Sequence, residues 1–137
     1  VWSGAQRDAG EVLGEQRRRI PQTSASLIQL VELADQARTS LLSSSDPLSE
    51  ISKLVNESWE LKRGLAEGID TAGISRLISD VRSAGASAAK VCGAGGGGFV
   101  MALVPVEERG TFAGRLAGHS VLDVELEPRG SRLVVSL

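Results

Sequence analysis

Apolar residues recur at helical spacing through the first two thirds of the chain, and this pattern predicts helices there. A first helix is expected over residues 7–19 and is expected to end at Pro21, because the residue before a proline disfavours helical geometry. A second helix begins at Thr23 or Ser24, since either side chain can cap its free N–H groups. The apolar positions of this second helix are Leu27, Leu30, Val31, Ala34, Ala37 and Leu41.

Two further helices are predicted from capping residues that are followed by apolar stripes. Asp46 can cap one helix, with Pro47 at its first position, where the missing N–H of proline costs no hydrogen bond. Thr71 can cap the next helix, and Gly85 lies just beyond its expected end. The apolar stripes are Leu48, Ile51, Leu54, Val55, Trp59 and Leu65 in the first of these helices, and Ile74, Leu77, Ile78, Val81 and Ala84 in the second.

The last third of the chain changes to strand patterns. Pro105 begins a short helix that is expected to run through Ala117. Between 122 and 126 apolar and acidic residues alternate, which predicts a strand with one wet face, and residues 127–130 have the signature of a turn. Strands are expected over residues 1–3, 90–92, 99–104, 122–126 and 132–137. Helices first and strands last predict an α+β domain, with helices packed on one face of a mainly antiparallel sheet.

The loop between the strands at 90–92 and 99–104 contains five glycines in the six positions 93–98. The spacing G-x-G-x-x-G is present, but a dinucleotide-binding fingerprint requires a helix after the loop, and here a strand follows. The phosphate loop of nucleotide triphosphatases is also excluded, because no Lys-Ser or Lys-Thr pair follows the last glycine. Two interpretations remain: N–H groups that bind an anion or pack on another phosphate-binding loop, and a glycine-rich hairpin turn.

Composition narrows the class of protein. The chain has 137 residues and a net charge of −2 with mixed signs, which suits one domain without a nucleic-acid footprint. We find no apolar run near the roughly 20 residues of a membrane span, and no signal peptide. A single Cys92 and a single His119 argue against a disulfide or a metal site, and favour a cytoplasmic location. The chain opens on Val1, as if within a strand, so a longer parent protein is expected.

Four clusters of residues, taken in order, carry a family resemblance. They are Ser3-Gly4-x-x-Arg7, then Glu57-Ser58-Trp59-x-x-Lys62-Arg63, then Gly85-x-x-x-x-Lys90-x-x-Gly93-Ala94-Gly95-Gly96-Gly97-Gly98-Phe99, and finally Gly130-Ser131-Arg132. In this order they resemble the C-terminal domain of the GHMP small-molecule kinases, over essentially the whole chain. Within that family the chain resembles the sugar kinases that act on heptose 7-phosphate, together with fucokinase-like relatives.

The resemblance implies a ferredoxin-like plait with extra helices and a role in an ATP- and Mg²⁺-dependent kinase that phosphorylates a sugar or sugar phosphate. In such kinases the glycine motif lies against the main phosphate-binding loop of an N-terminal domain. By position, this cofactor-binding role falls on Gly93, Ala94, Gly95, Gly96, Gly97 and Gly98. Since the chain contains no such Gly/Ser-rich loop and no candidate catalytic base, we expect residues 1–137 to be a single C-terminal domain. Alone it is expected to be inactive and to bind neither ATP nor magnesium.

Individual residues outside the glycine loop have a functional and a plainer interpretation. Arg7 can bind a substrate phosphate, or it can pair with an acidic neighbour. Trp59 and Lys62 lie three positions apart on one helix face, and they either border the substrate site or form a core tryptophan beside a solvated basic patch. Lys90 can face phosphate, or its stem can cover the sheet edge with its charge in water. Cys92 is expected to be a small buried hydrophobe.

Two other functions stay open at this stage. The chain can be a stand-alone small-molecule-binding or regulatory α+β domain without catalytic activity. It can also be a structural module that forms a homodimer through the exposed edge of the strand expected at residues 121–127.

Overall fold

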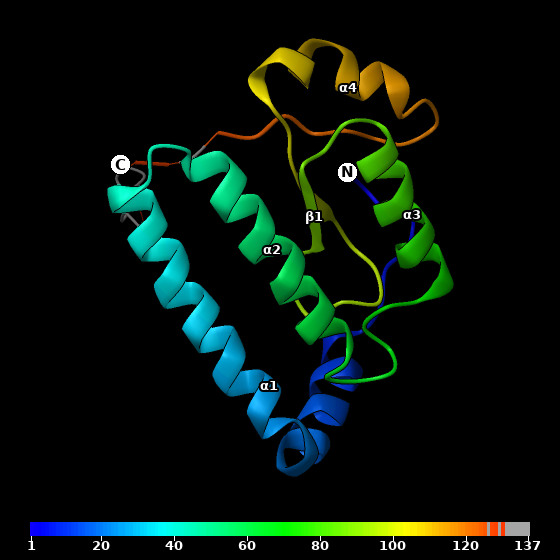
Figure 1. The fold of residues 1–137 in the computed structure, drawn as a ribbon. Helices are drawn as coiled ribbons and strands as arrows, with labels where there is room; N and C mark the ends of the chain where they lie inside the picture. Colours follow the sequence, from blue (N-terminus) through cyan, green and yellow to red (C-terminus); the bar gives the residue numbers. More distant parts are fainter. Residues whose placement is uncertain (126, 129, 131–137) are drawn as a thin grey trace, which may run out of the picture.

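The computed structural model describes residues 1–125, 127, 128 and 130, and their fold is α+β, as the sequence predicts (Figure 1). The helices α2 and α3 pack against an antiparallel pair of strands, and α1 packs along α2. In chain order the elements are α1 (Ala9–Ser43), α2 (Pro47–Arg63), α3 (Ala72–Ser83), β1 (Ala88–Val91), β2 (Val100–Leu103), η1 (Val106–Glu108) and α4 (Arg109–Arg115).

Helix α1 runs through Pro21, so the predicted break into two helices is wrong. Figure 1 shows the consequence, because the blue start of α1 crosses the bottom of the molecule before the helix turns to run beside α2. Proline has no N–H for the helical ladder, and its ring crowds the carbonyl one turn earlier, which bends a helix. In the same turn the Thr23 hydroxyl donates to the carbonyl of Arg19 at 2.9 Å. Proline therefore bends this helix without ending it.

The predicted caps of α2 and α3 are confirmed. A side-chain oxygen of Asp46 accepts a hydrogen bond from the Ser49 N–H at 3.2 Å, and Pro47 occupies the first position of α2. The Thr71 hydroxyl accepts from the Ile74 N–H at 3.3 Å. Each cap satisfies a backbone donor that has no partner inside its own helix. The two caps thereby fix where these helices begin, and with them the position of the connector at residues 64–71.

The sheet pairs β1 with β2 in antiparallel register, with Val91 opposite Val100. The predicted first strand takes part through a single bridge between Trp2 and Phe99, whose rings lie 4.9 Å apart. Backbone hydrogen bonds join Val1 to Val100 in both directions, at 2.7 and 2.8 Å. The start of the chain therefore extends the edge of the sheet next to β2.

The strand predicted over residues 122–126 is not formed in the described residues 121–125, where Leu122 and Val124 are 59% and 79% exposed. Alternation creates a strand only where a neighbouring edge can take its hydrogen bonds. The segment is held instead by an ion pair between Arg109 and Asp123 at 2.6 Å. The predicted turn is present, with the Gly130 N–H donating to the Glu127 carbonyl at 3.2 Å. The strand predicted over 132–137 lies outside the described residues.

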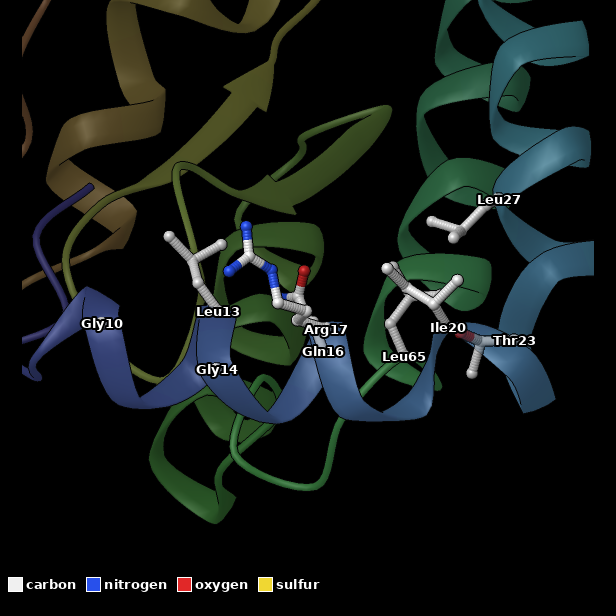
Figure 2. A pocket seen from close by; sticks show the side chains of 9 residues that line it. All are labelled: Gly10, Leu13, Gly14, Gln16, Arg17, Ile20, Thr23, Leu27 and Leu65. Atoms are coloured by element: carbon white, nitrogen blue, oxygen red, sulfur yellow. The ribbon is translucent and has the colours of Figure 1, made fainter.

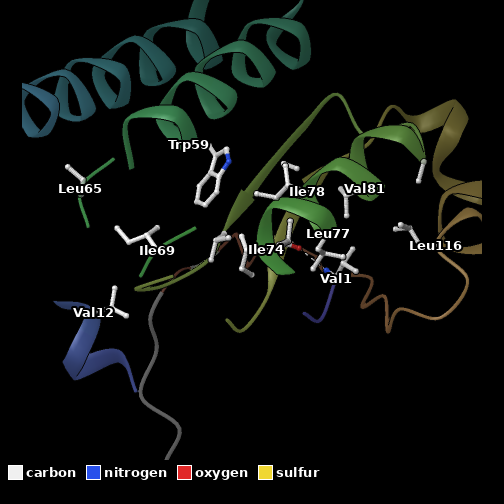
Figure 3. Packing of buried hydrophobic residues seen from close by; sticks show 14 of the residues in the cluster. Val1, Val12, Trp59, Leu65, Ile69, Ile74, Leu77, Ile78, Val81 and Leu116 are labelled. Atoms are coloured by element: carbon white, nitrogen blue, oxygen red, sulfur yellow. Dashed lines mark hydrogen bonds between the residues drawn. The ribbon is translucent and has the colours of Figure 1, made fainter. Parts of the chain in front are cut away.

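The hydrophobic core fills the space between α2, α3 and the inner face of the sheet (Figure 3). Trp59 of α2 is 2% exposed and Ile69 of the connector is fully buried. The other large side chains with almost no exposure are Val12, Ile74, Val81, Val91 and Val100. Among the described residues, no helix is both long and apolar enough to cross a membrane. The connector is therefore anchored in the core, directly beneath the loop that joins the two strands.

Candidate functional site

The glycine loop, residues 93–98, folds back onto its own chain. The Gly96 N–H donates to the Ile69 carbonyl at 2.8 Å, and the Gly98 N–H donates to the Ala5 carbonyl at 2.9 Å. The Gly98 carbonyl in turn accepts from the Ser3 N–H at 2.9 Å. The loop thus joins the start of the chain to the connector between α2 and α3.

Bare backbone is required in the middle of the loop by contacts within this chain. A Cβ on Gly96 would lie 2.6 Å from the Gly68 carbonyl oxygen, and one on Gly95 would lie 2.7 Å from a methyl carbon of Ile69. Both glycines also have positive φ, at +78° and +104°, which L side chains rarely adopt. The sequence suggested that the glycines accommodate another domain, whereas these two are already needed to seat the loop on its own connector.

The first half of the loop is more open than the second. Gly93 is exposed and Ala94 and Gly95 are half-buried, whereas Gly96 and Gly97 are buried. Within the described part of the chain, the N–H groups of residues 93–95 donate no hydrogen bond. Such backbone N–H groups can bind an anion, so this part of the loop keeps the chemistry that the sequence predicted. The assignment of residues 93–98 as cofactor-binding stays a prediction.

Two lysines lie beside the open half of the loop. The Lys62 ammonium group, on α2, donates to the Gly93 carbonyl, and the Lys90 ammonium group, on β1, donates to the Ser58 hydroxyl at 2.8 Å. Burial lowers the pKa of both lysines, and the Lys90 charge lowers the pKa of Lys62 further. The coulombic interaction with the nearby Cys92 opposes the shift in each case. In the described residues neither lysine forms an ion pair with a carboxylate. The open half of the loop is therefore electropositive.

Cys92 is exposed, so the prediction that it is a buried hydrophobe is wrong. Side chains alternate across a strand. Because Val91 faces the core, Cys92 faces the opposite side, where Phe99 is 40% exposed. The Cys92 N–H still pairs with the Phe99 carbonyl at 2.8 Å, which carries the strand pairing to the mouth of the loop.

Trp59 and Arg7 occupy different environments from the two lysines. Trp59 lies in the core, which agrees with the plainer of its two interpretations. A guanidinium nitrogen of Arg7 donates to the Gly68 carbonyl at 3.1 Å, and the Arg7 side chain packs over Gly96. In the described part of the chain Arg7 has no carboxylate partner. Of the four proposed substrate residues, the structure brings Lys62 and Lys90 together, places Arg7 against the buried half of the loop, and buries Trp59.

A cavity of about 560 Å³, which was not predicted from the sequence, lies in the bend of α1 (Figure 2). Leu13, Arg17 and Ile20 project from α1 on the side that faces Leu65. The cavity adjoins the glycine loop, because the Gln16 side chain donates to the Ala94 carbonyl at 3.4 Å. Its remaining lining residues are Gly10, Gly14, Thr23 and Leu27. The available signal was Pro21 inside a helical pattern that continues on both sides.

The described residues contain no cluster of metal-binding side chains for the magnesium ion that the resemblance implies. There, no group of three or more His, Cys, Asp or Glu side chains is arranged to hold a metal ion. Magnesium prefers carboxylate oxygens and phosphates as ligands, and the side chains beside the open half of the loop are ammonium groups and a thiol. We therefore assign no catalytic step to a metal on this chain.

Comparison with known proteins gives consistent matches. A family model described as GHMP kinases C terminal matches residues 46–115. Mevalonate kinase from Pyrococcus abyssi is 29% identical over 139 residues, covering 96% of this chain and 41% of that protein. Mevalonate kinase from Methanothermobacter thermautotrophicus is 32% identical over 97 residues, covering 68% of this chain and 30% of that protein.

A solved structure shares the fold. The crystal structure of L. major mevalonate kinase in complex with R-mevalonate superposes with a TM-score of 0.71 at 22% identity, covering 85% of this chain and 36% of that one. These relatives correct the branch that the sequence suggested, since they are mevalonate kinases rather than heptose 7-phosphate kinases or fucokinases. The chain spans about two fifths of the length of the Pyrococcus relative.

Proposed function

Because this chain belongs to the GHMP kinases through their C-terminal domain, we propose that it is the C-terminal domain of an ATP-dependent small-molecule kinase. On this proposal it works with an N-terminal domain of the same polypeptide. Support comes from the mevalonate kinase relatives, of whose length the chain spans 30 to 41%. The remaining length of those relatives is enough for another domain.

The observation that carries the proposal is the two-sided glycine loop. Its buried half is fixed by hydrogen bonds to Ile69 and Ala5, and its open half has N–H groups without a partner in the described residues. Phosphoryl transfer depends mainly on positioning and electrostatic stabilisation. A rigid loop with free N–H groups and no bulky side chains suits that task, because it approaches phosphate closely. We propose that residues 93–98 support the phosphate-binding site that the N-terminal domain completes.

ATP and magnesium are the cofactors of the complete enzyme on this proposal. Magnesium neutralises phosphate charge in kinases generally. On this proposal its ligands are the phosphates of the nucleotide together with carboxylates of the N-terminal domain. The contribution of this chain is to orient phosphate and acceptor through the glycine loop, with Arg7, Lys62 and Lys90 as the candidate substrate contacts.

The acceptor is a small molecule that carries a hydroxyl group. Mevalonate is the first candidate, because the relatives are mevalonate kinases. A sugar or sugar phosphate is the second candidate, because the four ordered clusters of the sequence suggested the sugar-kinase branch. Both classes of acceptor therefore belong in the test.

The test measures ATP-dependent phosphorylation of mevalonate and of a panel of sugars and sugar phosphates by the complete polypeptide. We expect transfer to one class of acceptor, and no transfer by residues 1–137 alone. Turnover by residues 1–137 alone would refute the need for an N-terminal domain. Failure of the folded, complete polypeptide to phosphorylate any of these acceptors would overturn the proposed activity.

A second candidate function has one specific observation in its favour. The cavity in the bend of α1 is large enough for a small ligand and combines apolar side chains with Arg17. A non-catalytic binding domain would bind such a ligand at this cavity without ATP. Protection of Arg17 from chemical modification by a ligand, in a polypeptide that transfers no phosphate, would favour this function over the first.

A further inference from the structure

Two of the three lysines of this chain meet at one place. Lys53 lies exposed on α2. Lys62 on α2 donates to the Gly93 carbonyl of the open half of the glycine loop, and Lys90 on β1 donates to Ser58, one turn before Lys62 on α2. The two ammonium groups are close enough for the charge of one to lower the pKa of the other. These elements come together across the edge of the sheet, where α2 runs beside β1.

The pairing is not explained by the fold. Some of the described basic side chains pair with carboxylates, as Arg109 does with Asp123 at 2.6 Å and Arg115 with Glu108 at 2.5 Å. Lys62 and Lys90 are half-buried and have only neutral partners, the Gly93 carbonyl and the Ser58 hydroxyl. Two like charges that lose water without gaining a counter-charge oppose folding. A negatively charged ligand bound beside the two ammonium groups would supply the missing counter-charge.

The neighbouring groups point to the chemistry of that occupant. The N–H groups of residues 93–95 are unused donors beside the two ammonium groups in the described chain. Ser58 is 8% exposed, and its hydroxyl donates to the Val55 carbonyl at 2.9 Å while it accepts from Lys90. Ser58 is therefore a positioning residue that aims Lys90. The free polar groups are all donors, which suits an oxyanion.

We propose that Lys62, Lys90 and the open half of the glycine loop form a binding site for an oxyanion, a phosphate or carboxylate group. The identity of this anion rests on the proposed kinase function. On that function, the anion is either the charged group of the acceptor or a phosphate group of the nucleotide. On binding, Lys62 exchanges its bond to the Gly93 carbonyl for one to the anion.

The direct test uses NMR of the complete polypeptide with ¹³Cε-labelled lysine. Signals are assigned with the variants Lys53→Met, Lys62→Met and Lys90→Met, and inorganic phosphate is titrated at constant ionic strength. We expect saturable shifts of the Lys62 and Lys90 signals and a rise in both pKa values, with no change at Lys53. No shift at Lys62 and Lys90, or an equal shift at Lys53, would overturn the site.

Kinetics then identify the source of the anion. Lys62→Met is expected to raise one Michaelis constant by about tenfold or more, because a charged hydrogen-bond donor is lost. A rise for the acceptor alone identifies the acceptor's anionic group, and a rise for ATP alone identifies the nucleotide. No change in either constant, with Lys53→Met as the matched control, would contradict the site. Lys62→Arg, which keeps the charge, is expected to retain phosphate binding if Lys62→Met fails to fold.

Ser58→Ala separates positioning from mere packing. It removes the acceptor of the Lys90 bond, so the Lys90 signal is expected to move more than the Lys62 signal, and phosphate affinity to fall. The phosphate titration needs no turnover, so its failure is distinguishable from failure of the kinase proposal. If the polypeptide is an active kinase but the Lys62 and Lys90 signals do not respond to phosphate, only the anion site is refuted. If the polypeptide is inactive but these signals respond to phosphate, only the kinase proposal is refuted.

Discussion

Replacing Gly96 by alanine tests why the glycine loop is bare. The new Cβ would lie 2.6 Å from the Gly68 carbonyl oxygen and 2.9 Å from the Cδ of Arg7. Arg7 can move, but Gly68 is backbone in a connector that Ile69 anchors in the core. The alanine would also have to adopt a φ near +78°, which costs an L residue about 1–2 kcal/mol. Relief of the clash would break the bond from the Gly96 N–H to Ile69, worth about 1 kcal/mol.

The expected loss for Gly96→Ala is therefore about 2–3 kcal/mol in the free energy of unfolding. Urea denaturation followed by circular dichroism measures it. Gly93→Ala is the matched control, since Gly93 also has positive φ, at +67°, but a Cβ there has no neighbour within 4 Å. It should lose only the backbone cost of about 1–2 kcal/mol. Equal losses for the two variants would refute the contact argument.

Four further predictions concern the rest of the chain. Trp59→Ala should lower the free energy of unfolding by about 3–5 kcal/mol, because the side chain is almost wholly buried, and urea denaturation checks this. Thr71→Ala should cost about 1 kcal/mol by the same assay, since it removes the cap of α3. Gly110→Ala should raise stability by up to about 1 kcal/mol, as this helical glycine has open space around its Cβ position. The free energy of unfolding should rise with pH between the lowered pKa values of Lys62 and Lys90 in the folded protein and about 10.4, because the unfolded chain binds more protons than the folded one in that window. Denaturation curves recorded over a pH series check this, and the free energy of unfolding should depend less on pH in Lys62→Met.

Much of the local structure could be predicted from sequence, because its causes are local. Asp46 and Thr71 cap their helices as expected, since a capping side chain bonds a donor only two or three residues away. Pro21 was misjudged because continuing α1 against α2 compensates for the lost hydrogen bond, and that packing is tertiary. The strand predicted over 122–126 is absent from the described residues 121–125 for a related reason, since alternation does not reveal whether a partner edge is available.

The candidate site was predictable in composition but not in arrangement. The glycine run marked the loop, yet its contacts with Gly68 and Ala5 depend on segments distant in sequence. The convergence of Lys62 and Lys90 likewise requires α2 to lie beside β1. The expected sugar-kinase branch rested partly on Trp59 and Arg63. In the structure Trp59 belongs to the core and Arg63 forms an ion pair with Asp70. Both residues therefore serve the fold and carry little information about the acceptor.

The contacts of the glycine loop also indicate at which stage of folding the loop becomes ordered. Val1 meets Val100, 99 positions away, and Arg7 meets Gly68, 61 positions away. Closing such long loops costs entropy before the contacts can compensate, so these meetings belong to the late stages of folding. The helices, whose contacts are local, are therefore expected to form before the glycine loop acquires its ordered surface.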